Sequence, residues 1–550
     1  MPPLGAFTFV LHSHLPYARQ AGRWPHGEEW LHEAAAETYA PLIRALEGLA
    51  ERSVPVRLTL SLTPILLEQL ADADVQRNFH AYLDEKIAAA SSDVARFEAA
   101  GDPHFAHLAS FYADRYRRVR EDFLERWASN LVPAFRRLEE RGVLEVITCA
   151  ATHGYLPLLD RDESIQLHLR TAMAAHRRHM GRAPKAIWLP ECAYRPAYVA
   201  EDGRVRPGME SFLAAHGLRL FFAETHMIEG GRPVGVAAGE AMGPYGDVIR
   251  RYVVPFSETR PARPATSLRP YFVNESEVAV AGRENRAGLQ VWSSDWGYPG
   301  DFDYREFHKK DGISGMQYWR ITGSRVDLAG KDPYHPDWAH AKVQAHADHF
   351  AGLVAGVLAQ FHAERDEFGL VCANYDTELF GHWWFEGVDW LRGVLERLAA
   401  SETVELTTAS SYLEAHPPDT ALQLPEGSWG AGGAHFVWDN ADTHWVWPIV
   451  HDSERRMTQA ASRFPNASGE TERALNMAAR ELLLLQSSDW PFLITTGQAR
   501  EYAVERFRGH VDRFHQLLDA AEAGGDSGLV DRIWERDKVF PDIDYRWFAA

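Results

Sequence analysis

The segment AFTFVLHSHLPY, residues 6–17, decides the fold class. It begins with the mostly apolar run Ala6–Leu11 and becomes polar at His12 and His14. A short run of consecutive, rather than alternating, apolar residues is typical of a strand that is covered on both faces. Polar side chains that directly follow such a strand are where a parallel β/α protein builds its site. The segment therefore predicts a buried parallel strand that carries functional histidines at its end.

Similar runs recur along the chain, and helix-forming sequence separates them. The six further predicted strands are Val56–Leu62, Leu144–Cys149, Ala186–Leu189, Leu218–Ala223, Leu289–Trp292 and Gly369–Ala373. Val404–Thr408 is a possible eighth strand. Strands that alternate with helices indicate parallel crossovers, so the pattern predicts an α/β fold, specifically a β/α barrel of seven or eight strands.

The intervals between the predicted strands differ in composition. A helix-forming stretch rich in Ala, Arg and Glu predicts an inserted helical subdomain at 73–142, and a Gly-, Pro- and Arg-rich stretch predicts a long loop over the barrel mouth at 229–286. Two amphipathic segments near the end of the chain predict a C-terminal helical domain. We expect a catalytic barrel at 1–399 and this helical domain at 400–550.

Composition restricts the partners. The 550 residues contain 77 acidic and 57 basic side chains, so the net charge of −20 disfavours nucleic acid and anionic membranes. The three cysteines have no CxxC spacing, and we find neither a signal peptide nor an apolar span, which predicts a cytoplasmic protein. Aromatic residues make up 12%, and many lie beside Gly, Asp or Asn, which suits neutral sugar rings. We expect a monomer or a small homo-oligomer.

Two carboxylates follow predicted strands that are not neighbours in sequence, Glu191 after the fourth and Asp376 after the seventh. Two such groups that face each other across a barrel mouth can cleave a glycosidic bond, because one acts at the anomeric carbon while the other protonates the leaving oxygen. The alternative is that these acids cap helices or form ion pairs. Asp295, Glu224 and Glu378 are weaker candidates.

His12 and His14 are one residue apart, so on a strand their side chains point the same way. They suit hydrogen bonding to substrate hydroxyls, but a metal site is an alternative in which His153, His226 and Asp376 supply further ligands. A purely structural role is also possible. Rings that suit sugar stacking better than metal binding surround these positions: Tyr17, Trp188 and Trp292.

Tryptophans also gather in the Gly-rich stretch Gly427–Trp447. There, Trp429, Trp438, Trp445 and Trp447 fit a binding platform at least as well as a core. Asp489 next to Trp490, at a break in helical periodicity, suits a residue that reaches back to the barrel.

In these segments the chain resembles glycoside hydrolase family 57, and within it the 1,4-α-glucan branching enzymes. The segments that carry the resemblance are HSHLPY at 12–17, ATHGYLP at 151–157, WLPECAYRP at 188–196, VWSSDWGYPGD at 291–301, ANYDTELFGHWWFEG at 373–387 and LLLLQSSDWPF at 482–492. One such motif is weak evidence, whereas this set in order, over nearly the whole chain, is specific. The resemblance implies a (β/α)7 barrel with a helical insertion and a C-terminal all-α domain.

The resemblance also implies a retaining mechanism on an α-1,4-glucan, with transfer of the cleaved fragment to a 6-hydroxyl and no metal or organic cofactor. Glu191 would be the nucleophile and Asp376 the general acid and base. The residues that would contact the glucan are His12, His14, His153, Trp188, Tyr245, Trp292, Trp429, Trp438, Asp489 and Trp490. An α-amylase or a 4-α-glucanotransferase of the same family, a metal-dependent barrel hydrolase and a noncatalytic glucan-binding protein remain alternatives.

Overall fold

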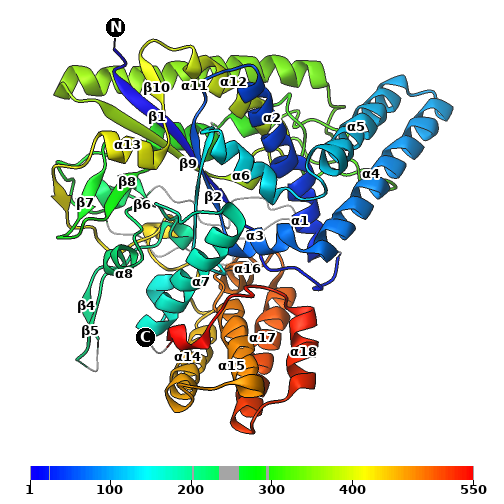
Figure 1. Cartoon of the computed structure of the whole chain (residues 1–550). Coiled ribbons are helices and arrows are strands. Elements are labelled where there is room, and N and C mark those ends of the chain that lie inside the picture. The colour runs from blue at the N-terminus through cyan, green and yellow to red at the C-terminus, as the bar shows by residue number, and fades with distance from the viewer. Residues whose placement is uncertain (1, 24, 201–202, 234–258, 293–296, 549–550) are drawn as a thin grey trace.

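The computed structural model describes residues 2–23, 25–200, 203–233, 259–292 and 297–548. Its centre is a closed barrel of seven parallel segments (Figure 1). In barrel order these are β1 (Gly5–Ser13), β2 (Leu58–Leu62), β3 (Leu144–Ile147), the extended pair 186–187, β6 (Leu220–Ala223), β8 (Ala279–Gly282) and β9 (Gly369–Asp376). Single parallel bridges join 186–187 to both neighbours and close β8 onto β9. The predicted (β/α)7 barrel is confirmed.

Strand parity separates the inside of the barrel from its outside. Every second residue of β1, at Ala6 and Val10, packs in one buried cluster with Trp188, Phe222 and Cys372 from other segments. The intervening residues, such as Phe7 and Phe9, belong to a different cluster that includes the outer helices. Side chains alternate between the two faces of a strand, so His12 continues the inward set of β1.

The possible eighth strand is short and does not enlarge the barrel mouth. β10 (Val404–Leu406) pairs only with residues 5–7 of β1, whereas β2 pairs with residues 10–13 of the same edge. The barrel therefore has an eighth strand only at the rim where its strands begin, and seven segments at the rim where they end. The chain still contacts the barrel past residue 400, and the domain boundary there stays a prediction.

The prediction of a strand at Leu289–Trp292 is wrong. These residues are the second half of helix α10 (Asn285–Trp292), which buries Ala287 and Val291 on one face and leaves Leu289 44% exposed. The sixth strand of the barrel is instead β8, which pairs antiparallel with β7 (Tyr271–Val273). Both lie inside 229–286, so that interval is not one continuous loop. Short runs such as AVAG give no periodic signal, which explains the error.

The remaining elements cover or extend the barrel. Helices beside it are α1 (Glu28–Ala34), α2 (Ala40–Glu51), α3 (Pro64–Ala71), α6 (Val132–Glu140), α7 (Asp162–Met180), α8 (Met209–Ala215), α9 (Thr225–Ile228), α11 (Pro336–Arg365), α12 (Gly387–Ala399) and α13 (Ala409–Ala415). Short strands form a hairpin, β4 (Tyr198–Val199) with β5 (Val205–Arg206), and a pair of β11 (Ala421–Leu422) with β7.

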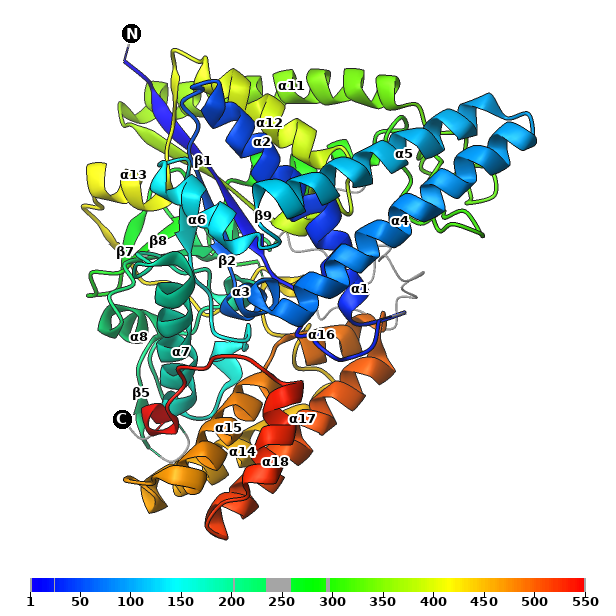
Figure 2. The same ribbon diagram turned by 45° about the vertical axis from the view of Figure 1, so that its right-hand side comes forward.

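Helices α4 (Ala73–Ala99) and α5 (Pro103–Glu121) form an antiparallel pair that projects from the barrel between β2 and β3 (Figures 1 and 2). Asp72 caps α4 by accepting from the backbone N–H groups of Asp74 and Val75. Asp102 caps α5 in the same way and is followed by Pro103 at the first helical position.

The C-terminal helices form a separate bundle below the barrel in Figure 1. They are α14 (Val446–Arg463), α15 (Gly469–Leu485), α16 (Asp489–Thr496), α17 (Arg500–Glu522) and α18 (Ser527–Arg536). α15 packs along α17, and it buries Leu475, Ala478 and Leu482 among its apolar residues. No helix among the residues described combines the length and apolar character that a bilayer crossing needs.

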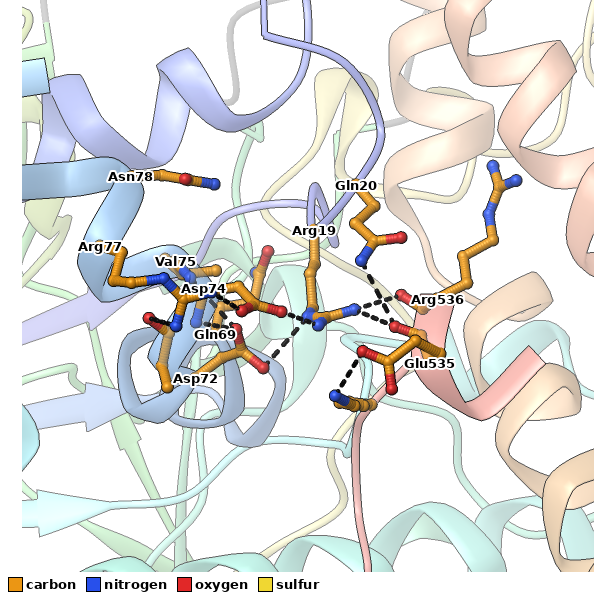
Figure 3. Close-up of polar contacts among 12 residues, drawn as sticks. Arg19, Gln20, Gln69, Asp72, Asp74, Val75, Arg77, Asn78, Glu535 and Arg536 are labelled. Atoms are coloured by element: carbon orange, nitrogen blue, oxygen red, sulfur yellow. Dashed lines mark hydrogen bonds and ion pairs between the residues drawn. The ribbon is translucent and has the colours of Figure 1, made fainter. Parts of the chain in front are cut away.

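Arg19, five residues after His14, joins the barrel, the inserted helices and the C-terminal bundle (Figure 3). Its side chain is 1% exposed. It donates to Asp72 (3.0 Å) and to Asp74 at the start of α4, and to the carbonyls of Glu535 (2.6 Å) and Arg536 (2.8 Å) at the end of α18. Carbonyls at a helix C-terminus carry partial negative charge, so one guanidinium satisfies acceptors from both modules.

We expect Arg19→Met to destabilise the fold by about 2–3 kcal/mol, because it leaves the partly buried Asp72 carboxylate and two helix-end carbonyls without their partner. Arg77→Met is the matched control, since Arg77 also pairs with Asp74 but is 70% exposed, and should cost less than about 1 kcal/mol. Urea unfolding followed by circular dichroism measures both. Equal losses would contradict a special role for Arg19.

Candidate active site

The histidines that end β1 lie in a hydrogen-bonded cluster at the carboxyl end of the barrel. His12 and His153 face each other with their Nε2 atoms 3.0 Å apart. The Nδ1 atom of His12 lies 3.1 Å from the Ser61 hydroxyl of β2. His153 follows β3 with a left-handed backbone (φ 59°), and its Nδ1 lies 2.7 Å from the Ser488 hydroxyl. Each ring is therefore fixed through both nitrogens.

His14 connects the barrel to the C-terminal bundle. Its Nε2 lies 2.9 Å from Asp489 Oδ1, at the first residue of α16, and its Nδ1 lies 3.1 Å from the Thr63 hydroxyl. Asp489 also accepts from the Ser487 hydroxyl (2.6 Å). The C-terminal helices thus supply two side chains, Ser488 and Asp489, to the barrel mouth.

Burial keeps the inner histidines neutral. It lowers the pKa of His12 and of His153 well below the usual value, and the neighbouring His14 lowers both further. A neutral imidazole has one N–H donor and one bare nitrogen acceptor. The pair therefore brings no buried charge into the site, and its four nitrogens are paired with each other and with the hydroxyls of Ser61 and Ser488.

Glu191 lies in the turn after the fourth barrel segment. Its backbone is left-handed (φ 60°, ψ 24°), an uncommon state for a residue other than glycine that tends to occur at functional sites. Trp429 holds it twice: the indole N–H donates to Glu191 Oε2 (2.6 Å), and the backbone N–H donates to the Glu191 carbonyl (3.1 Å). The other carboxylate oxygen lies 4.0 Å from His153 Nδ1.

Asp376 ends β9 at the level where His12 ends β1, since the two residues are register partners. It also continues the inward parity of Leu370 and Cys372, so its side chain belongs to the barrel interior. Glu191 and Asp376 therefore come from the same end of the same barrel.

The two carboxyl groups have raised pKa values. Burial raises the pKa of Glu191 to about 8, and the charge of Asp376 contributes to the rise while the Trp429 hydrogen bond opposes it. Burial raises the pKa of Asp376 to about 7, against the opposing effects of His14 and Arg283. Because their charges interact, the two groups titrate as a pair. Between these two values the pair holds one proton, which the higher pKa places on Glu191 in the free protein, whereas a reaction in which Glu191 attacks needs that proton on Asp376.

The weaker carboxylate candidates have other partners. Glu378 accepts from the Tyr39 hydroxyl and from the backbone N–H of His14 (3.1 Å), so it anchors the histidine segment. Glu224 forms a buried ion pair with Arg283 (2.6 Å). Asp295 lies outside the described residues. Arg283 was missed in the sequence because it follows β8, the strand that was not predicted, and Ser488 because a lone serine gives no signal.

The predicted aromatic residues divide into two groups. Trp188 stacks on His12 (ring centroids 4.8 Å apart, planes at 9°) and is fully buried, so it supports the histidine. Trp429 lies edge-on to Trp188 (5.0 Å) and to Trp292 (5.9 Å), and both Trp429 and Trp292 remain partly exposed. These two are the rings that can meet a sugar.

Trp438 and Trp490 are core residues, contrary to the expectation that they line subsites. Trp438 is 1% exposed and stacks on Tyr155 (4.3 Å), and Trp490 is 0% exposed and donates its indole N–H to the Leu484 carbonyl (2.8 Å). Fully buried rings have no face left for a ligand. Tyr245 lies outside the described residues.

The metal alternative finds donor atoms, although not in the expected set. Among the residues that the structure describes, His12, Cys149 and His153 form one group with donor atoms within 4.8 Å of one another, and His14, His153 and Asp489 form another. No group within that described part combines His12, His14 and Asp376. The histidine nitrogens in both groups already have hydrogen-bond partners in the cluster.

Comparison with known proteins decides the family. The model of Glycosyl hydrolase family 57 matches residues 8–425, more than half of the chain. The chain belongs to glycoside hydrolase family 57. A second model, 1,4-α-glucan branching enzyme, C-terminal, matches residues 449–548, which span the helices from α14 to α18.

Relatives of known structure have the same fold. A 1,4-α-glucan branching enzyme of Thermococcus kodakarensis is 43% identical over 98% of this chain and 78% of its own length. Its crystal structure superposes with a TM-score of 0.91 over 100% of this chain and 97% of that one. The family 57-type branching enzyme of Pyrococcus horikoshii gives 0.88 at 41% identity, covering 100% and 97% of the two chains. The α-amylase AmyC of Thermotoga maritima gives 0.82 at 29% identity, covering 99% of each.

We expect Trp429→Phe to move the acid limb of kcat/KM to higher pH. Loss of the indole N–H removes a hydrogen bond that favours ionised Glu191, so the pKa of Glu191 rises above about 8 and a higher pH is needed to deprotonate it. Trp292→Phe is the control, because that indole donates to the Asn374 carbonyl (3.4 Å) instead. A pH profile of Trp429→Phe that matches the wild type would contradict this role.

Proposed function

We propose that the protein is a 1,4-α-glucan branching enzyme in which Glu191 and Asp376 perform a retaining double displacement. The observation that carries the proposal is the interacting pair of buried carboxyl groups at the carboxyl end of the barrel, with pKa values near 7 and 8. The branching-enzyme C-terminal match and the relatives at 41–43% identity support the choice of reaction. We place the enzyme in the cytoplasm and in glycogen-type biosynthesis.

In the first step, Glu191 attacks the anomeric carbon of an α-1,4-linked glucose while Asp376 donates its proton to the leaving 4-oxygen. The bond between the anomeric carbon and that oxygen breaks, and an ester to Glu191 forms. In the second step, Asp376 takes the proton from the 6-hydroxyl of an acceptor glucan, whose oxygen displaces Glu191. The product has an α-1,6 bond, and both residues return to their starting states.

We assign His12, His14 and His153 to the hydroxyls of the glucose that is being transferred, with His12 and His153 as neutral rings. Each ring is preorganised by a hydroxyl or carboxylate from a neighbouring element, so little reorganisation is needed when substrate binds. Trp429 both orients Glu191 and presents a ring to the sugar. Transfer to a glucan rather than to water requires that the acceptor be held in place, and Trp292 and Trp429 offer faces for it.

Hydrolysis is the nearest rival, since an α-amylase of the same fold is 29% identical. We expect amylose incubated with the protein to gain α-1,6 linkages, visible by proton NMR and by chain release with a debranching enzyme. Only new reducing ends, without branches, would overturn the branching assignment and leave the retaining chemistry in place.

We expect Glu191→Ala and Asp376→Ala each to lower kcat by about 10³-fold or more. The two roles can be separated with azide as a small nucleophile. With an α-maltosyl fluoride, whose leaving group needs no proton, azide should rescue Asp376→Ala and give an α-glycosyl azide, since the ester still forms on Glu191, whereas rescue of Glu191→Ala should give the β-anomer. Glu378→Ala serves as a comparison, because Glu378 anchors the His14 segment and azide should not rescue its loss. Opposite anomers from the two catalytic variants would reverse the assigned roles.

We expect exhaustive chelation to leave the branching rate unchanged, because the proposed steps use only carboxyl groups. The rate on amylose is measured after dialysis against a chelator and again after zinc is added. Loss of activity that zinc restores would favour the metal-dependent alternative and the ligand group of His12, Cys149 and His153.

A further inference from the structure

Two large aromatic side chains on the outside of the barrel are each about half exposed, Trp338 at 50% and Phe302 at 51%. Trp338 lies in the first turn of α11, and Phe302 lies in the segment that precedes this helix in the chain. Arg320 links them, since its Nη1 donates to the Phe302 carbonyl (3.2 Å) and its guanidinium lies 5.6 Å from the centre of the Trp338 ring. Isolated exposed rings are common, but two around one arginine form a patch.

The patch is rigid. His335 stacks beneath Trp338 (4.0 Å, planes at 20°), and the Thr322 N–H donates to the Phe302 carbonyl (2.8 Å). The Arg320 N–H donates to the Asp332 carbonyl (2.9 Å), which ties the arginine to the same frame. The Trp338 ring and the backbone that carries Phe302 are thus preorganised, which lowers the entropic cost of binding a ligand there.

The charged groups around the rings are paired with one another. Arg320 pairs with Asp303 (3.4 Å) and Asp332 (2.7 Å), and Lys342, one helical turn after Trp338, pairs with Asp301 (3.2 Å). Asp332 and Lys342 are 52% and 44% exposed, so acceptors and donors remain available at the edge of the rings. This combination of flat apolar faces and paired polar groups matches a pyranose, which has an apolar C–H face, hydroxyls at its rim and no charge.

We propose that the Trp338 surface, formed by Phe302, Asp303, Arg320, Asp332, Trp338 and Lys342, binds a segment of α-glucan chain away from the carboxylate pair. The inference rests on the α-glucan substrate of the proposed function. Trp338, Phe302 and Arg320 are residue types that protein interfaces also favour, but Asp303, Asp332 and Lys342 around them are types that such interfaces lack, so a protein partner fits less well. Binding here would hold a long polymer near the enzyme and raise its effective concentration at the barrel mouth.

The test compares Trp338→Ala and Phe302→Ala with Leu328→Ala, which removes an aliphatic side chain of similar exposure (46%). Each change is made in a Glu191→Gln background, so that the polymer stays intact, and retardation is measured in native gels that contain amylopectin. We expect each aromatic variant to bind about fivefold more weakly and Leu328→Ala to bind as the parent does. Because the replaced rings are half exposed, circular dichroism should show an unchanged fold.

The same three changes in the active protein separate this surface from the catalytic site. We expect Trp338→Ala to lower kcat/KM on long amylose and to leave kcat/KM on short maltooligosaccharides unchanged. Unaltered retardation in both aromatic variants would overturn the proposal. If the retardation is unaltered but the sedimentation mass changes, the surface is instead a contact between subunits. Failure of the wild type to branch amylose would instead overturn the proposed function.

Discussion

Strand parity in a closed barrel is the constraint on which the site depends. Inward residues of β1 run from Ala6 to His12, and inward residues of β9 run from Leu370 to Asp376. Because the two strands pair in register, His12 and Asp376 reach the barrel mouth at the same height. A shift of one residue in either strand would turn its functional group towards the outer helices. The apolar packing that closes the barrel therefore also sets the position of the chemistry.

The same closure determines the electrostatics. The barrel mouth beside Trp188 and Trp429 buries both carboxyl groups, so it penalises a second negative charge beside the first. Glu191 and Asp376 consequently share a proton near neutral pH, although free carboxyl groups would both be ionised. The strained turn at Glu191 persists because Trp429 holds both its backbone and its side chain. Burial thus keeps a proton on the pair, and the Trp429 hydrogen bond lowers the pKa of Glu191 relative to burial alone.

Sequence patterns predicted the barrel and the carboxylate pair because both depend on local signals: apolar runs that end in polar residues. The sequence patterns gave wrong predictions where tertiary contacts determine whether a segment is a strand or whether a side chain is buried. β8 is too short to show a period, so the barrel strand that precedes Arg283 was overlooked. Trp438 and Trp490 lie in polar-looking sequence, yet Tyr155 and the α15 helix cover them completely. Asp489 was recognised as reaching back to the barrel, whereas its partner His14 could be known only once the bundle was placed.

The C-terminal bundle is best understood as part of the site rather than as an appendage. Ser488 and Asp489 orient His153 and His14, and Arg19 ties the end of α18 to the segment that follows these histidines. The short connection from His14 to Arg19 is thus fixed at both ends by the bundle. Any loosening of the bundle would release two of the three histidines at once, even with every barrel residue in place. Stability of the bundle and geometry of the histidine cluster are therefore properties of the same contacts.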